Sequence, residues 1–160
     1  MAARRGRNSY DRMKAQNDLL GHAGGDALLV DAARRLSGAV RPGDIVGRLG
    51  GDEFVAICRH TTTPEEAEAL AARLALSMHW VFSAGTHHFP VSASVGVVHC
   101  VDAESTAEVL ARADVAMYRA KVSATGEPVM WNDSLSVTEP EVLEFARLHR
   151  LPLREPDTEE

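Results

Sequence analysis

The chain has 160 residues, of which 45% are hydrophobic and 25% charged, and its formal net charge is −6. This length and composition fit one globular domain and exclude a disordered or collagen-like chain. The acidic balance argues against a surface that coats nucleic acid, because such surfaces need dense Lys and Arg. Since no segment has the apolar run of a signal peptide or membrane span, we expect a cytoplasmic protein without membrane insertion.

Two residue types are rare in this chain. Of the 17 basic residues, Lys14 and Lys121 are the two lysines, and the others are arginines. Compositional bias can produce such a count by chance, so the count only marks these positions as candidates. Cys58 and Cys100 show no metal-ligand spacing, and we expect buried thiols rather than a disulfide.

Periodicity and turn residues predict a chain in which helices and strands alternate. In chain order, the expected elements are helices over 11–20 and 26–40, strands over 45–49 and 53–59, a helix over 64–82, a strand over 90–101, a helix over 104–122 and a closing strand over 128–131. Gly21 ends the first helix, and Thr63 with Pro64 starts the third. This order, with one tight hairpin, indicates an α+β sandwich of a sheet against helices.

Charge and pattern divide the chain into three parts. The first 16 residues carry a net charge of +4, and residues 134–160 carry −4. We expect a basic N-terminal segment over 1–8, one folded domain over 9–133 and an acidic C-terminal tail over 134–160. Within the tail, a weaker pattern over 139–150 predicts a helix that is either solvated or bound to a partner.

The predicted hairpin combines acidic residues with a flexible turn. Gly50 and Gly51 let the backbone pass close to a bulky ligand, and Asp52 and Glu53 follow them directly. Carboxylates are hard oxygen ligands, which Mg²⁺ prefers together with phosphate oxygens. Taken alone, Gly-Gly-Asp is also an ordinary turn sequence, so the flanking segments must decide between the two interpretations.

Six segments along the chain match one pattern in the same order. They are K-x-x-N-D at 14–18, G-H-x-x-G-D at 21–26, R-x-x-D at 41–44, G-G-D-E-F at 50–54, S-x-G at 94–96 after Ser92, and A-D-x-x-x-Y-x-A-K at 113–121. Together they cover about residues 9–131 and resemble the GGDEF family, the diguanylate cyclases that join two GTP into cyclic di-GMP. So many ordered matches exclude a chance resemblance.

The resemblance implies a fold and a reaction. The fold is a ferredoxin-like, palm-type sandwich with a central antiparallel sheet flanked by helices. The cofactor is Mg²⁺ or Mn²⁺, the substrate is GTP and the product is cyclic di-GMP. In such enzymes the 3′-hydroxyl of one GTP attacks the α-phosphate of the other, and pyrophosphate leaves. Since one domain holds one GTP, the resemblance implies an antiparallel homodimer.

The resemblance also assigns acids and an inhibitory site. Asp52 would bind the metal, and Glu53 would assist it or help to deprotonate the attacking hydroxyl. Asp11 would be a further metal ligand if it reaches the site. Arg41 and Asp44 would form an inhibitory site for cyclic di-GMP, although residues of this kind around Pro-Gly are also a natural exposed turn.

The substrate-binding residues implied by the resemblance come from four segments. They are Lys14, Asn17, Asp26, Gly50, Gly51 and Lys121. The lysines would hold the triphosphate as point charges, and Asn17 and Asp26 would read the mixed donors and acceptors of the guanine edge. Without the resemblance, Lys14 is a solvated helix residue, and Asn17 and Asp26 are turn or cap residues.

The sequence departs from the family at three places. Ser9 stands where the family has the first Asp of D-x-D-x-F-K, and a neutral hydroxyl binds divalent metals poorly. Residues 1–8 are basic where the family has a buried apolar strand, so we expect a first strand that is missing or atypical, as in a truncated or mis-started chain. Thr125 stands where many relatives have a phosphate-binding Arg.

These departures leave the function open between three interpretations. The first is a diguanylate cyclase-type domain with weak or lost activity, because its metal site is impaired. The alternative is a non-enzymatic domain that senses GTP or cyclic di-GMP. The third is a structural interaction module that works through the helix over 139–150.

Overall fold

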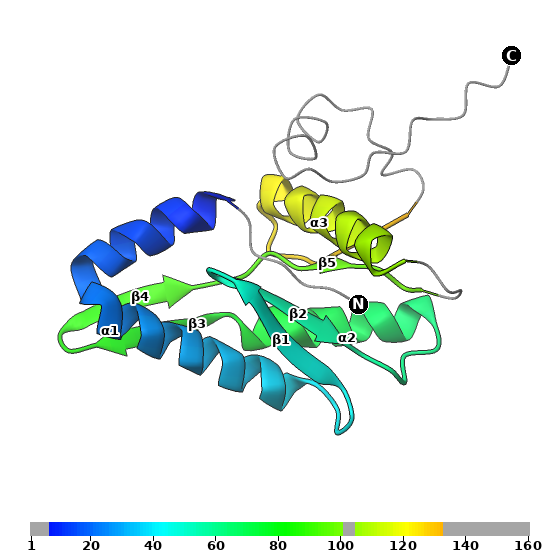
Figure 1. Cartoon of the computed structure of the whole chain (residues 1–160), viewed down its shortest axis with the longest axis horizontal. Helices are drawn as coiled ribbons and strands as arrows, with labels where there is room; N and C mark the ends of the chain where they lie inside the picture. The colour runs from blue at the N-terminus through cyan, green and yellow to red at the C-terminus, as the bar shows by residue number, and fades with distance from the viewer. Residues whose placement is uncertain (1–6, 101–104, 133–160) are drawn as a thin grey trace, which may run out of the picture.

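The computed structural model describes residues 7–100 and 105–132, and for residues 7–20 it describes the backbone alone. Helices and short strands alternate along the chain (Figure 1). In chain order they are α1 Arg7–Ala39, β1 Ile45–Gly50, β2 Glu53–Ile57, α2 Pro64–Ser77, β3 Trp80–Ala84, β4 His87–Val91, β5 Gly96–Val97, α3 Thr106–Ser123 and β6 Val129–Met130. The α+β class predicted from the sequence is confirmed.

Helix α1 consists of two arms that meet at Gly21. This residue has φ 67° and ψ 172°, outside the helical region, and Figure 1 shows the dark blue first arm turning away from the lighter blue second arm. Residues with a Cβ rarely adopt such a positive φ, so glycine permits the bend. The predicted helices over 11–20 and 26–40 are confirmed as these two arms, although the first begins earlier, at Arg7.

The strands form three two-stranded ladders within the described residues. β1 pairs with β2 and β3 with β4, both antiparallel, while β5 and β6 are parallel. The predicted hairpin is confirmed, with Arg48 opposite Phe54. The sheet implied by the resemblance is thus divided into ladders, and residues 7–44 contain no strand. Most of the segment over 1–8, where we expect the first strand to be missing or atypical, lies outside the described residues.

The predicted end of the third helix is wrong. α2 ends at Ser77, and Trp80 begins strand β3 instead. Trp80 is 8% exposed in the main core, and Phe82 packs against that core. Burial of these aromatic side chains as a strand therefore overrides the helical spacing of the preceding alanines and leucines. Instead of the single strand predicted over 90–101, the structure has two strands, β4 and β5.

The remaining helix boundaries follow local signals. Thr63 caps α2, accepting a hydrogen bond from the Glu66 N–H at 3.2 Å. Ser105 and Glu108 form a capping box at the start of α3, which lies where the sequence predicts it. The predicted closing strand is confirmed as β6. The domain boundary near residue 133 and the tail helix over 139–150 lie outside the described residues.

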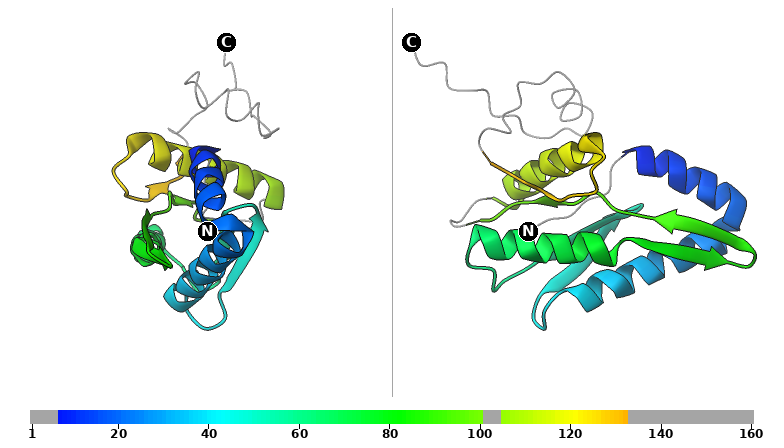
Figure 2. Two further views of the ribbon diagram at one scale, coloured as in Figure 1. Left: turned by 90° about the vertical axis from the view of Figure 1, so that its left-hand side faces the viewer. Right: turned by 180° about the vertical axis from the view of Figure 1, so that it is seen from behind.

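The helices lie on two sides of the strands, with α3 over β5 and with α1 and α2 on the other side (Figure 2). The main core joins α1 and α2 to β2, and its members are Leu28, Ala32, Leu36, Ala39, Phe54, Ala56, Leu70, Leu74, Met78, Trp80 and Val91. On the other side, α3 lies directly against β5, since a Cβ on Gly96 would overlap the Ala113 carbonyl oxygen and the Met117 nitrogen. Gly96 therefore allows a backbone approach that no other residue permits.

Two further properties bear on the sequence predictions. Cys58 is half-buried, whereas Cys100 is exposed, so the expectation of a buried thiol is wrong for Cys100. Neither cysteine is in a disulfide. No helix within the described residues is long and apolar enough to cross a bilayer.

Candidate functional site

The tip of the β1–β2 hairpin is shaped by two glycines. Gly50 has φ 157° and Gly51 φ 51°, and the register shifts between Arg48 and Gly50. A Cβ on Gly51 would meet no atom within 4 Å, so its backbone conformation, rather than space, calls for glycine. The Arg48 Nε donates to the Gly51 carbonyl at 2.8 Å. This hydrogen bond holds the turn next to the two acidic residues.

The acids that follow the turn have different surroundings. Asp52 is 6% exposed, and Glu53 is half-buried at the start of β2. Asp52 lines a cavity of about 30 Å³ together with Ser94 and the apolar side chains of Leu28, Phe54 and Trp80. This cavity has room for about one water molecule. A buried carboxylate in such surroundings is stable only with donors or a cation nearby.

Trp80 is a site residue that the sequence reasoning missed. It lines the same cavity as Asp52 and Phe54 of the hairpin, and its buried indole nitrogen has no hydrogen-bond partner within the described residues. The Arg35 guanidinium stacks over its ring at 4.6 Å and also bonds Asp31 at 3.2 Å. A tryptophan near the end of a predicted amphipathic helix was the available signal, but only burial distinguishes strand from helix there.

The candidate residues of α1 are divided by the bend. The backbone places Lys14 and Asn17 three residues apart on the first arm, which puts them on one helix face. Asp26 is exposed on the second arm, beyond Gly21. Asp11 also belongs to the first arm. The angle at Gly21 therefore sets how the two groups of residues face each other.

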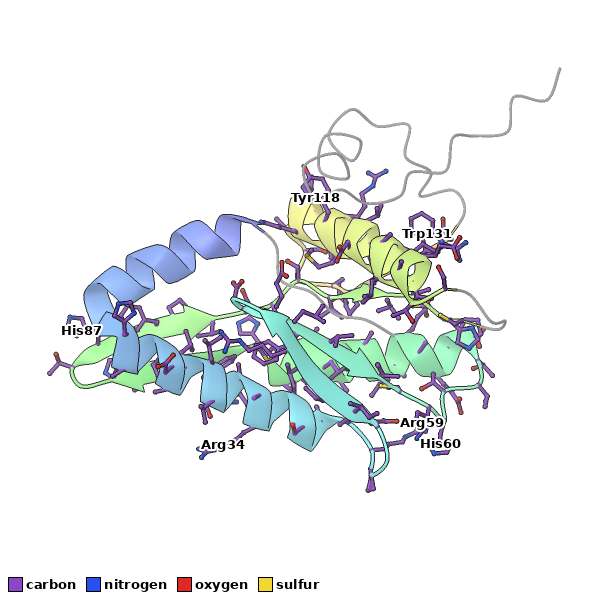
Figure 3. All side chains as sticks on the ribbon, viewed as in Figure 1. Arg34, Arg59, His60, His87, Tyr118 and Trp131 are labelled. Atoms are coloured by element: carbon purple, nitrogen blue, oxygen red, sulfur yellow. The ribbon has the colours of Figure 1, made fainter. Side chains whose placement is uncertain are left out.

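Three elements with candidate residues gather on one side of the molecule. Figures 1 and 2 show the start of α1, the tip of the β1–β2 hairpin and the C-terminal end of α3 close together. Lys121 lies in the last turn of α3 and is half-buried. Figure 3 labels Tyr118 at the same end of this helix. This side of the fold can therefore combine acidic and basic side chains around one anionic ligand.

The Arg41 to Asp44 turn lies at the opposite end of the hairpin, near the labelled Arg59 and His60 (Figure 3). The Asp44 carboxylate accepts hydrogen bonds from the backbone N–H of Arg41 at 3.0 Å and of Arg59 at 3.1 Å. The Asp44 N–H donates to the Arg41 carbonyl at 3.0 Å. Arg41 itself is exposed. Asp44 therefore has a structural role here, whether or not the turn also binds a ligand.

The donor set fits a hard cation held jointly with a ligand. Among the described side chains, no group of three or more His, Cys, Asp or Glu residues could hold a metal without other ligands. Asp52 and Glu53 together offer two carboxylates at the hairpin tip. Mg²⁺ characteristically combines one or two carboxylates with phosphate oxygens and water, so this pair fits such an ion.

The palm-like α+β fold and the acidic hairpin define the class of this domain. The family described as "Diguanylate cyclase, GGDEF domain" matches residues 9–127. The chain belongs to this family, which acts in cyclic di-GMP signalling.

Comparison with individual proteins agrees with this assignment. The chain is 42% identical over 111 residues to the diguanylate cyclase DgcM of Escherichia coli, covering 69% of this chain and 26% of DgcM. It is 34% identical over 142 residues to the bifunctional diguanylate cyclase/cyclic di-GMP phosphodiesterase MucR of Pseudomonas aeruginosa, covering 88% and 20%. The chain thus spans about a fifth to a quarter of the length of these relatives.

A solved structure shows the same fold. The isolated GGDEF domain of TpbB from Pseudomonas aeruginosa superposes with a TM-score of 0.71 at 34% sequence identity. The match covers 84% of this chain and 77% of that domain. Part of the TpbB domain therefore has no counterpart in the matched region.

Proposed function

We propose that this chain is a diguanylate cyclase-type domain that binds GTP, and that its conversion of two GTP into cyclic di-GMP and two pyrophosphates is weak or lost. One observation carries this proposal: the buried Asp52 and half-buried Glu53 follow a Gly50-Gly51 turn at the side where α1 begins and α3 ends. This arrangement suits a metal-screened triphosphate.

Asp52 and Glu53 are the residues that would hold Mg²⁺ or Mn²⁺. When bound, the ion would neutralise charge on the triphosphate during phosphoryl transfer. Asp11, on the first arm of α1, is a further candidate ligand. Ser9 contributes only a neutral hydroxyl where the family has an Asp, so we expect reduced metal affinity and, with it, reduced turnover.

The other residues would bind and orient GTP. Lys14 and Lys121 would attract the triphosphate from two elements that meet on this side of the fold. Asn17 and Asp26 would pair with the guanine edge from the two arms of α1. Because Gly51 has no side chain, the nucleotide would be able to approach the backbone at the hairpin tip.

The chemistry requires two domains because each would hold one GTP. In an antiparallel homodimer, the 3′-hydroxyl of one GTP would attack the α-phosphate of the other, with pyrophosphate as leaving group. Glu53, which is half-buried beside the tip, would accept the proton of this hydroxyl. Two such transfers close the cyclic dinucleotide.

A second candidate function is a non-enzymatic sensor of GTP or cyclic di-GMP. The specific observation in its favour is that residues 7–44 contain no strand and that Ser9 replaces the expected carboxylate. An exposed Arg41 on the turn at the far end of the hairpin would then bind cyclic di-GMP. In that case, Arg41→Ala abolishes cyclic di-GMP binding, while GTP binding through Asn17 and Asp26 survives.

Two measurements test these proposals. Purified chain is incubated with GTP and Mg²⁺ or Mn²⁺, cyclic di-GMP is quantified by chromatography, and Asp52→Asn serves as the inactive control. Calorimetry with each nucleotide then separates an impaired cyclase from a sensor. Robust cyclic di-GMP formation would overturn the proposed impairment. If neither nucleotide binds, the proposed function itself is wrong.

A further inference from the structure

Three polar side chains line the cavity of about 30 Å³ beside the β1–β2 hairpin. Asp52 belongs to the hairpin turn, Trp80 begins β3, and Ser94 lies between β4 and β5. The other side chains that line the cavity belong to Leu, Ala, Phe, Met and Val residues. A donor or acceptor inside this cavity therefore has these three side chains as hydrogen-bonding partners.

The indole N–H of Trp80 is a buried donor without an acceptor. Its nitrogen is shielded from solvent, and no described residue accepts a hydrogen bond from it. The Asp52 carboxylate lines the same cavity and is 6% exposed, yet no direct hydrogen bond joins it to the indole. Native proteins pair nearly all buried polar groups with protein atoms or ordered water, because an unpaired donor is costly. The two groups therefore call for a small molecule that joins them.

Both the backbone and the ring of Trp80 are held in place. Trp80 pairs with Val91 in the β3–β4 ladder, which fixes the backbone. The Arg35 guanidinium lies over the ring, 4.6 Å from its centroid, and the Arg35 Nε donates to Asp31 at 3.2 Å. A ring covered by a tethered cation loses freedom to rotate, so its N–H keeps one direction. Such a donor can orient a partner on the hairpin.

The volume and the polar partners of the cavity suit one water molecule. About 30 Å³ accommodates one water, and buried waters make about three hydrogen bonds. A water at this position accepts the Trp80 N–H, donates one proton to the Asp52 carboxylate and shares a further hydrogen bond with the Ser94 hydroxyl. Water-mediated hydrogen bonds are nearly as favourable as direct ones, and a charged acceptor strengthens them.

We propose that one buried water joins the indole N–H of Trp80 to the carboxylate of Asp52, and that Trp80 thereby positions this carboxylate. Trp80 acts through the water, so it is a positioning residue and not a catalytic one. A carboxylate held in one orientation is prepared for a metal ion, because outer hydrogen-bond partners orient metal ligands. This last consequence rests on the proposed function, whereas the water-mediated contact does not.

The water-mediated contact is tested by NMR on the unaltered chain, with ¹⁵N in its tryptophans. The chain has two indole N–H groups, and Trp80→Phe removes one signal and so assigns it. We expect a rotating-frame cross-peak between this proton and a long-lived water. Asp52→Ala should shift the signal and speed its exchange with solvent at least about tenfold, because the water loses its charged acceptor. Glu53→Ala, which changes an acid outside the cavity lining, should do neither.

The positioning of Asp52 is tested by metal binding. Calorimetry with Mn²⁺ in the presence of GTP should show about tenfold weaker metal binding by Trp80→Phe, which keeps an aromatic ring but loses the N–H. Trp131→Phe is the matched control, since Trp131 also has a buried indole nitrogen without a partner and an arginine over its ring, but lies outside this cavity. It should bind the metal like the unaltered chain.

Absence of the water cross-peak, or a Trp80 signal that does not respond to Asp52→Ala, would overturn the proposal. Equal and measurable metal affinities of Trp80→Phe and Trp131→Phe would also overturn it, because a purely structural Trp80 lowers the melting temperature without changing metal affinity. If the cross-peak is present but the unaltered chain binds neither metal nor GTP, the contact is confirmed and the proposed function is wrong.

Discussion

The carboxylate of Asp44 accepts the backbone N–H of Arg59 at 3.1 Å, although these residues are 15 positions apart. Its other oxygen accepts the Arg41 N–H at 3.0 Å. One side chain thus joins the turn before β1 to the segment after β2. It thereby closes the open end of the hairpin whose tip carries Asp52.

Asp44→Ala should therefore destabilise the fold. Loss of two backbone hydrogen bonds to one carboxylate resembles the loss of a helix cap and should lower the free energy of unfolding by about 1–2 kcal/mol. Urea denaturation measures this change. Asp31→Ala, which removes a surface ion pair with Arg35, is the matched control and should cost less than about 0.5 kcal/mol. Equal effects of the two variants would contradict the role assigned to Asp44.

Gly96→Ala should be strongly destabilising. A Cβ at this position would overlap backbone atoms of Ala113 and Met117, which cannot rotate away. We expect a loss of about 3 kcal/mol or more, measured by thermal or urea unfolding. Gly38→Ala, where a Cβ meets open space within α1, should instead raise stability by about 0.5–1 kcal/mol. A mild effect at Gly96 would mean that β5 and α3 are further apart than described.

Gly51→Val should disturb the hairpin tip through the backbone alone. The φ of 51° suits a residue without a Cβ, and a β-branched residue there should cost about 1–2 kcal/mol. Gly51→Asn should cost less, because Asn tolerates left-handed conformations. Denaturation curves of both variants, together with GTP calorimetry, distinguish strain from a lost contact. If Asn and Val behave alike, side-chain crowding rather than φ is responsible.

Ser9→Asp should raise metal-dependent formation of cyclic di-GMP. The change adds a carboxylate where the family places a metal ligand, and we expect an increase of about tenfold or more at limiting Mg²⁺. Ser9→Asn, which has the same shape without the charge, is the control and should have no such effect. An unchanged rate in Ser9→Asp would count against the alignment of this segment with the family motif.

Alkaline pH should weaken the fold through Cys58. Burial, followed by the negative charge of Asp44, raises the pKa of this thiol from 9.0 to about 11. Between these values, the unfolded chain binds fewer protons than the folded one, so stability falls as pH rises. The contribution is complete below about pH 9 and lost by about pH 11. Between pH 9 and 11, the free energy of unfolding should fall more steeply with pH for the unaltered chain than for Cys58→Ala. Parallel curves of this free energy against pH would refute the raised pKa.

Local signals predict much of this fold. Gly21 as a helix end, the Thr63-Pro64 start of α2 and the Gly50-Gly51 turn each depend on neighbouring residues, and each is confirmed. The sequence could not predict strand β3, because Trp80 and Phe82 enter it through burial against distant residues.

The candidate site could likewise be predicted only in part. The motif predicts the acids at the hairpin tip, and the structure places them on the expected turn, whereas their roles and those of Lys14 and Asn17 stay predictions. The two hydrogen bonds of the Asp44 carboxylate and the cavity that Trp80 shares with Asp52 could not be predicted, because both bring together residues that are distant in the sequence.

Trp80 gives this domain a built-in optical probe. The chain has two tryptophans, and this one shares a small cavity with Asp52 while a guanidinium covers its ring. Indole emission depends on local charge and hydration, so an event at the hairpin tip changes the fluorescence of a residue that needs no label. Replacing Trp131 by Phe isolates that signal, and the occupancy of the signature hairpin then becomes readable from the spectrum of the unlabelled protein.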